Sequence, residues 1–168
     1  MKRYIGTKLI NAKPMTRQEY NTFRGWELPA DENGEDEGFL VEYVDGGKAN
    51  TPVYDGYVSW SPKDVFGRSY WPCDGMSFGL ALDAMRWGAK VARAGWNGKG
   101  MWIALGEGSK ETPAANFWNR HSRAFAEANG GSAEVLPYIL FKTADDKILM
   151  GWLASQTDIL AFDWQIVE

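Results

Sequence analysis

The stretch Arg93-Ala94-Gly95-Trp96-Asn97-Gly98-Lys99-Gly100 predicts a tight hairpin in the C-terminal half of the chain. Asn-Gly strongly favours the positive φ angles of a two-residue hairpin turn. Such a turn sets its flanking residues opposite each other, so Trp96 and Lys99 are expected side by side at the tip. An aromatic ring beside a cation and exposed N–H groups can stack a base and hold a phosphate. The alternative is an ordinary hairpin whose tryptophan packs into the core.

The sequence around this hairpin predicts a small α+β unit made of a helix and antiparallel hairpins. Ser77 is a candidate N-cap, and the apolar residues that follow it have the spacing of one helix face, ending near Gly88. Ser155 to Asp158 has the form of a capping box, which opens a short helix. Strands are expected over 91–96, 99–105, 138–143, 148–152 and 164–167, and a second helix over 113–128.

The N-terminal part predicts a separate α+β unit, and Trp71-Pro72-Cys73-Asp74-Gly75 is a plausible linker between the two. Thr16 and Glu19 have capping-box spacing, and Pro62 suits the first position of another helix. The acidic run 27–38 is typical of a solvated loop, although it also suits a divalent cation; it lacks the pattern of an EF-hand. Strands are expected over 4–12, 39–44 and 54–60.

Composition excludes several classes of protein. The formal net charge of -4 argues against wrapping of a nucleic acid polymer, and no apolar run approaches a membrane span. The single cysteine, Cys73, fits a reducing compartment. Nine tryptophans are more than two small cores can easily bury, so some are expected at subunit interfaces or in a ligand pocket. A symmetric homo-oligomer is therefore expected.

The sequence carries no motif of a known catalytic or cofactor site. There is no Cys/His metal spacing and no glycine-rich nucleotide loop, so neither a metal nor a cofactor is expected. The one histidine, His121, could pair with Asp158 or Glu127 as an acid and base. A lone histidine on a polar helix is more often a surface residue, which favours a protein that is not an enzyme.

A second group of candidate ligand-binding residues follows the predicted strand that ends at Trp152. An indole there can stack a base, and Asp158 can accept from ribose hydroxyls or an adenine amino group. The N–H groups of the helix that follows suit a phosphate. The alternative is that Ser155 and Asp158 only cap their own helix. The candidate ligand-binding residues are Trp96, Asn97, Gly98, Lys99, Trp152, Ser155, Gln156, Thr157 and Asp158.

Several motifs in the second unit occur in the order of a known family. They are Met76-Ser77-Phe78-Gly79, Arg93 to Gly100, Leu136-Pro137-Tyr138-Ile139, Lys142-Thr143-Ala144-Asp145, Trp152 to Asp158, and Asp163-Trp164. Over residues 76–168 the chain resembles the small phage proteins known as Thoeris anti-defence proteins of the second class. Residues 1–72 resemble an accessory segment of other phage proteins, through pieces such as Arg24-Gly25-Trp26 and 57–62, and that resemblance implies no function.

The family resemblance implies a sponge that acts in the cytoplasm of the infected bacterial host. Such proteins bind glycocyclic ADP-ribose, the signal made by bacterial TIR-domain enzymes, and hold it without degrading it, so that the effector is not activated. The resemblance also implies a homotetramer with pockets between subunits, and some relatives bind the cyclic dinucleotides of CBASS-type defence. The rival readings are an enzyme that hydrolyses such a signal and a module that binds a host protein.

The segment 111–134 departs from the minimal family pattern. It is a possible lid that brings Arg120 or Arg123 to a phosphate. The favoured interpretation is an amphipathic helix that packs Phe117 and Phe125 on the sheet.

Overall fold

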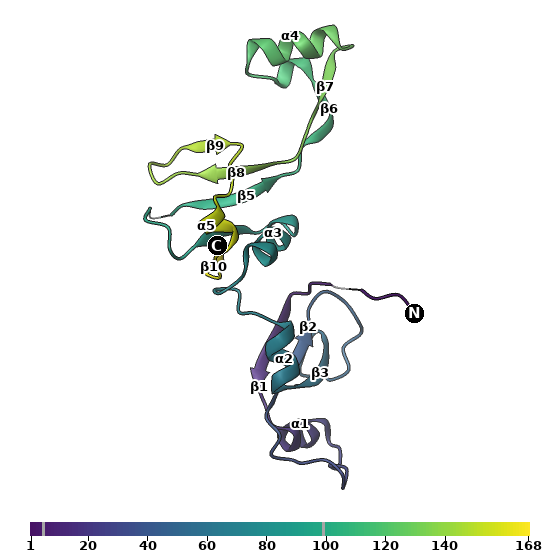
Figure 1. Ribbon diagram of the computed structural model, residues 1–168. Helices are drawn as coiled ribbons and strands as arrows, with labels where there is room; N and C mark the ends of the chain where they lie inside the picture. Colours follow the sequence, from purple (N-terminus) through teal and green to yellow (C-terminus); the bar gives the residue numbers. More distant parts are fainter. Residues whose placement is uncertain (5, 99) are drawn as a thin grey trace. The chain divides into compact units, whose positions relative to one another are not determined.

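The chain divides into two compact units, Met1–Trp71 and Pro72–Glu168 (Figure 1). The computed structural model describes residues 1–4, 6–98 and 100–168. Each unit combines short helices with antiparallel sheets, which confirms the predicted α+β class. Among the helices of the described residues, none is long and apolar enough to cross a membrane.

The first unit is a three-stranded sheet with two helices. Thr16 caps α1 and forms the predicted capping box with Glu19. The core of this unit is built from Tyr20, Leu40 and Val58, so α1 packs on the sheet through Tyr20. The elements are β1 (Ile10–Pro14), α1 (Arg17–Arg24), β2 (Gly38–Tyr43), β3 (Tyr57–Pro62) and α2 (Lys63–Ser69), and the sheet order is β1-β2-β3.

Two predictions for the first unit are wrong in their boundaries. The strand expected over 4–12 is instead β1, because among the described residues of this segment Ile10–Pro14 alone pair with β2. Pro62 does not start α2; it ends β3 in an extended conformation, with φ -55° and ψ 146°, and serves as the N-cap.

The second unit is built on a five-stranded antiparallel sheet that buries one face under a helix. Ser77 caps α3, as predicted, and Ala81 and Met85 of α3 are buried with Val91, Ile103 and Trp164 of the sheet. The elements are α3 (Phe78–Arg86), β4 (Lys90–Arg93), β5 (Trp102–Gly106), β8 (Tyr138–Lys142), β9 (Ile148–Met150), α5 (Gln156–Ile159) and β10 (Trp164–Val167), and the sheet order is β10-β4-β5-β8-β9. Strands β8, β9 and β10 lie where the sequence predicts them, except that Trp152 follows β9 rather than ending it.

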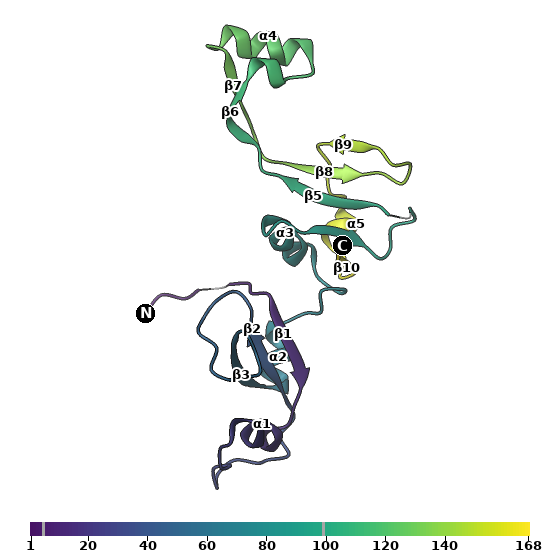
Figure 2. The same ribbon diagram turned by 180° about the vertical axis from the view of Figure 1, so that it is seen from behind.

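The segment for which a helix over 113–128 is expected instead belongs to an arm, residues 109–135, which contains two strands and two short helices. Two strands, β6 (Ser109–Pro113) and β7 (Ser132–Val135), continue from β5 and β8 and carry η1 (Ala114–Asn116) and α4 (Arg120–Ala128) at their far end (Figure 2). The prediction that this segment packs on the sheet is wrong. Helix α4 packs on its own ribbon through small side chains, while Phe125 is 63% exposed. The helix begins late because Asn119 caps it. The arm's core residues are Ala114, Ala126 and Ala133, with Phe117 packed against them.

Candidate functional site

The tight hairpin is not formed, because β4 ends at Arg93 and β5 begins at Trp102, and the connection 94–101 between them is longer than a two-residue turn. The pairing of β4 with β5 sets the length of this connection, since Val91 lies opposite Ile103. The predicted two-residue turn at Asn97-Gly98 is therefore wrong. Asn97 is exposed, whereas Gly98 is packed tightly. A Cβ atom on Gly98 would lie 2.1 Å from the Met101 sulfur and 2.6 Å from the Ala144 Cβ atom. The loop thus rests on the β8–β9 turn. Lys99, expected opposite Trp96, lies outside the described residues.

The start of this loop is fixed by Arg93, at the end of β4. Its Nε donates to Asp163 Oδ1 and its Nη1 to Asp158 Oδ1, each at 2.8 Å. The Gly95 backbone N–H donates to Asp163 Oδ2 at 2.8 Å. The Arg93 side chain is only 17% exposed. One guanidinium therefore ties β4 to α5 and to the start of β10, and it sets the path of the loop.

Both oxygens of the Asp158 carboxylate are used by protein donors. Oδ1 accepts from Arg93 and from Trp96 Nε1 (3.2 Å), and Oδ2 accepts from the Ser155 backbone N–H (3.1 Å) and Oγ (2.6 Å). Burial alone would raise the pKa of Asp158, but the hydrogen bonds from Ser155, Arg93 and Trp96 outweigh it and lower the pKa to about 2. The hydrogen bond from Arg93 likewise lowers the pKa of Asp163. Ser155 and Asp158 form the predicted capping box, and Asp158 also accepts hydrogen bonds from Arg93 and Trp96, so it does more than cap its helix.

The remaining candidates on α5 lie at the surface. Gln156 and Thr157 are exposed, and the Ser155 hydroxyl lies 2.8 Å from that of Thr157. The helix has only 4 residues. The structure therefore brings Ser155 and Asp158 into the Arg93 network, and it leaves Gln156 and Thr157 open to solvent.

Trp96 and Trp152 belong to one aromatic cluster on the core. Their ring centroids are 6.0 Å apart with an interplanar angle of 70°, which is an edge-to-face contact. Trp96 also packs edge-to-face on Phe141 and Trp164, at 5.4 Å each. Two walls with a base between them would have to be parallel and apart, so the two rings do not form such a sandwich here. Both rings are half-buried, so each keeps an outer surface.

Sequence reasoning missed a basic and aromatic group beside the loop. Lys142 of β8 lies directly opposite Trp102 of β5, and the Lys90 ammonium lies 5.7 Å from the centre of the Trp102 ring. A Cβ atom built on Gly100 would lie 3.3 Å from Lys142 Nζ. The family motif Lys142-Thr143-Ala144-Asp145 contained this lysine, but only the strand register brings it to the loop.

His121 lies on α4, on the arm, where its Nε2 accepts a hydrogen bond from Arg120 Nε at 3.2 Å. Asp158 lies on α5, where its carboxylate is occupied as described above. Within residues 1–4, 6–98 and 100–168, no group of three His, Cys, Asp or Glu side chains has metal-binding geometry.

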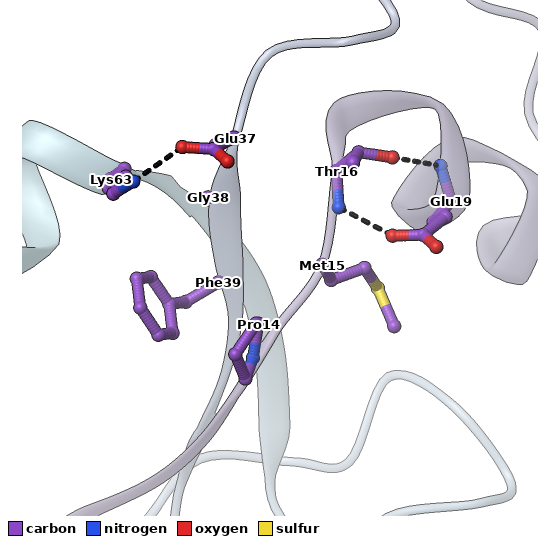
Figure 3. A pocket seen from close by; sticks show the side chains of 8 residues that line it. All are labelled: Pro14, Met15, Thr16, Glu19, Glu37, Gly38, Phe39 and Lys63. Carbon is purple, nitrogen blue, oxygen red and sulfur yellow. Dashed lines mark hydrogen bonds and ion pairs between the residues drawn. The ribbon is translucent and has the colours of Figure 1, made fainter.

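Two cavities lie among the described residues of the first unit. The larger, of about 430 Å³, lies between the start of α1 and the start of α2 (Figure 3). An ion pair between Glu37 and Lys63 (2.5 Å) and the Thr16–Glu19 capping box flank its apolar floor. The smaller, of about 280 Å³, is lined by Arg17, Glu32, Asp36 and Trp60. No predicted ligand residue among those described lines either cavity. The larger cavity is lined by Pro14, Met15, Thr16, Glu19, Glu37, Gly38, Phe39 and Lys63.

Comparison with known proteins singles out the second unit. The family model for the Thoeris anti-defense 2-like domain, Tad2-like, matches residues 76–167. The chain is also similar to Thoeris anti-defense 2 of Bacillus phage SP01, with 42% identity over 93 residues, which are 55% of this chain and 96% of that protein. The matched segment contains the loop, the Arg93 network and Lys142, and it excludes both cavities of the first unit.

Proposed function

Because the chain belongs to the Tad2-like family of Thoeris anti-defence proteins, we propose that it counters this defence by binding and sequestering glycocyclic ADP-ribose. The observation that carries the proposal is the match over residues 76–167, together with a relative of 42% identity whose length is covered almost completely. The signal is made by bacterial TIR-domain enzymes, so the protein would act in the cytoplasm of the infected host.

The proposed ligand site is the surface formed by the loop Ala94–Met101, the outer faces of Trp96 and Trp152, and the exposed start of α5. The ligand contains an adenine ring, two riboses and a pyrophosphate-type bridge. An outer indole face is suited to stacking the base, which is worth about 1–3 kcal/mol. Asn97, Gln156 and Thr157 are exposed and offer hydrogen-bonding groups for the riboses. In this proposal Asp158 does not contact the ligand; it orients Trp96 by accepting a hydrogen bond from the indole N–H.

We propose that binding leaves the ligand intact. A hydrolase needs a group that transfers protons to or from the reacting atoms. The groups best suited are committed elsewhere, because Asp158 accepts four hydrogen bonds from the protein and His121 lies on the arm, beside Arg120. A protein that only sequesters the ligand needs a surface complementary to it and no group that transfers protons.

The test is a calorimetric titration with glycocyclic ADP-ribose, followed by heat denaturation and chromatography of the released ligand. Tight binding with intact ligand recovered is the expected outcome. Altered ligand would mean that the protein is an enzyme. No heat with glycocyclic ADP-ribose, but binding of a cyclic dinucleotide, would assign the chain to the signal of CBASS-type defence. If neither glycocyclic ADP-ribose nor a cyclic dinucleotide binds, a host protein remains as the target.

The proposal includes a homotetramer with ligand pockets between subunits. Large apolar side chains that are half or more exposed support self-association, since soluble monomers rarely expose extended apolar patches. Light scattering at micromolar concentration measures the mass, and a monomer would contradict this part of the proposal. Seven of these side chains lie within one stretch of the chain: Ile148, Leu149, Met150, Leu153, Ile159, Leu160 and Phe162.

A further inference from the structure

Lys142 occupies an unusual place for a surface lysine. It lies on β8, inside the five-stranded sheet, with Trp102 opposite it on one side and Ile148 on the other. Directly opposite residues project from the same face of a sheet. The lysine side chain is therefore held between two apolar side chains, and only 19% of it is exposed.

The ammonium of Lys142 lies at the end of the proposed ligand loop. A Cβ atom on Gly100 would lie 3.3 Å from Nζ, so the loop backbone at Gly100 runs close to the ammonium. Gly100 has φ +66°, a conformation that other residues rarely adopt. Lys90 stands on the same face, 5.7 Å from the Trp102 ring. Two ammonium groups and an indole thus lie on one face of the sheet, and the ammonium of Lys142 lies beside Gly100.

The current partner of Lys142 is weakly held. Its Nζ lies 2.6 Å from Asp146 Oδ1, but the Asp146 side chain is 84% exposed. An ion pair with so exposed a carboxylate contributes little to stability, because water solvates the carboxylate nearly as well. A phosphate presents more negative charge and more acceptor oxygens than this carboxylate, so it competes effectively for the ammonium.

We infer that Lys142 is the cation that binds the pyrophosphate bridge of the ligand, and that Asp146 holds its ammonium in place until the phosphate displaces it. This inference rests on the proposed function, and it names a residue that the predicted site lacked. Lys90 adds a second positive charge on the same face of the sheet, near Trp102.

The test compares four variants of the full chain by calorimetry with glycocyclic ADP-ribose. Lys142→Gln is expected to weaken binding by about tenfold to a hundredfold, as for loss of a hydrogen bond to a charged group. It should also flatten the dependence of affinity on salt. Lys147→Gln is the matched control: it removes a lysine of the same hairpin that pairs with Asp145 at 2.5 Å and is 75% exposed. It should change the affinity by less than about twofold.

The variant Asp146→Asn tests whether the Lys142–Asp146 ion pair competes with the ligand or only stabilises the turn. Asp146 has φ 59°, and asparagine tolerates this left-handed conformation, so the turn is kept. Freeing the ammonium should tighten binding several-fold, whereas a purely structural ion pair would predict no gain. Lys142→Met, which keeps the packing on Trp102, guards against a misfolded glutamine variant. Wild-type affinity in both Lys142 variants, or weaker binding in Asp146→Asn, overturns the inference. No binding by the wild type overturns the proposed function itself.

Discussion

Two cation–carboxylate groups of the second unit, around Arg93 and around Lys142, differ in burial and in which charges the protein leaves available to a ligand. Arg93 is largely buried, and its two carboxylate partners, Asp158 and Asp163, receive further hydrogen bonds from the protein. Lys142 pairs with one exposed carboxylate, beside a glycine loop. Groups whose hydrogen bonds are already made fix the shape of a site, whereas a charge with a replaceable partner is suited to a ligand. We therefore call Arg93 with Asp158 and Asp163 the frame, because it holds the loop in shape. Lys142 with Asp146 is the group that we propose for ligand binding.

Removing the Arg93 side chain should give the largest effect. Arg93→Ala leaves two carboxylates in a partly buried place without their main partner, so the free energy of unfolding should fall by about 2–4 kcal/mol. Denaturant unfolding measures it. The control is Arg86→Ala, since Arg86 is 60% exposed and pairs with Asp83 on the same helix. If the free energy of unfolding falls equally in Arg93→Ala and Arg86→Ala, the buried Arg93 group stabilises the fold no more than an exposed ion pair.

Adding one methyl group to the loop should come next. In Gly98→Ala the new Cβ atom collides with Met101 and Ala144, which forces the loop off the β8–β9 turn. We expect a loss of about 1–3 kcal/mol in stability and weaker ligand binding. Gly79→Ala is the control, because Gly79 lies at an exposed position of α3 and its new Cβ atom makes only an ordinary contact, at 3.7 Å from Ser77 Oγ. Unchanged binding in Gly98→Ala would separate the loop from the site.

Acid should weaken the frame over a defined range. The folded pKa of Asp158, about 2, is below its ordinary value of 3.8. Its contribution is therefore complete above about pH 4 and is lost as the pH falls toward 2. We expect about 1–2 kcal/mol, allowing for solvent screening. Unfolding of wild type and Asp158→Asn across this range measures it, and parallel pH curves for the two would refute the assignment.

The smallest effect on stability belongs to Asn97. Its side chain is exposed at the loop tip, so Asn97→Ala should change the free energy of unfolding by less than about 0.5 kcal/mol. Ligand affinity should nevertheless fall by about tenfold if the amide binds the ligand. Calorimetry and thermal melting on one preparation give both numbers. Wild-type affinity would restrict Asn97 to its role in the loop.

Much of the local structure was predictable because its signals lie within a few residues. Thr16, Ser77 and Ser155 cap helices as predicted, since each cap bonds a backbone N–H three residues on. The predicted helix over 113–128 was wrong because its first residues end β6, whose partner β7 is distant in sequence. The Asn-Gly signal failed for a similar reason, because the packing of Gly98 on Ala144 outweighs the local turn preference.

The sequence by itself determined the α+β class, the helix caps, most strands of the second unit and, through its ordered motifs, the family. These depend on short-range backbone preferences and on residue identities. Only the tertiary structure decided that Asp158 is saturated, that Trp96 and Trp152 touch edge to face, and that Lys142 stands beside Gly100. Those relations join residues tens of positions apart, and strand register and core packing bring them together.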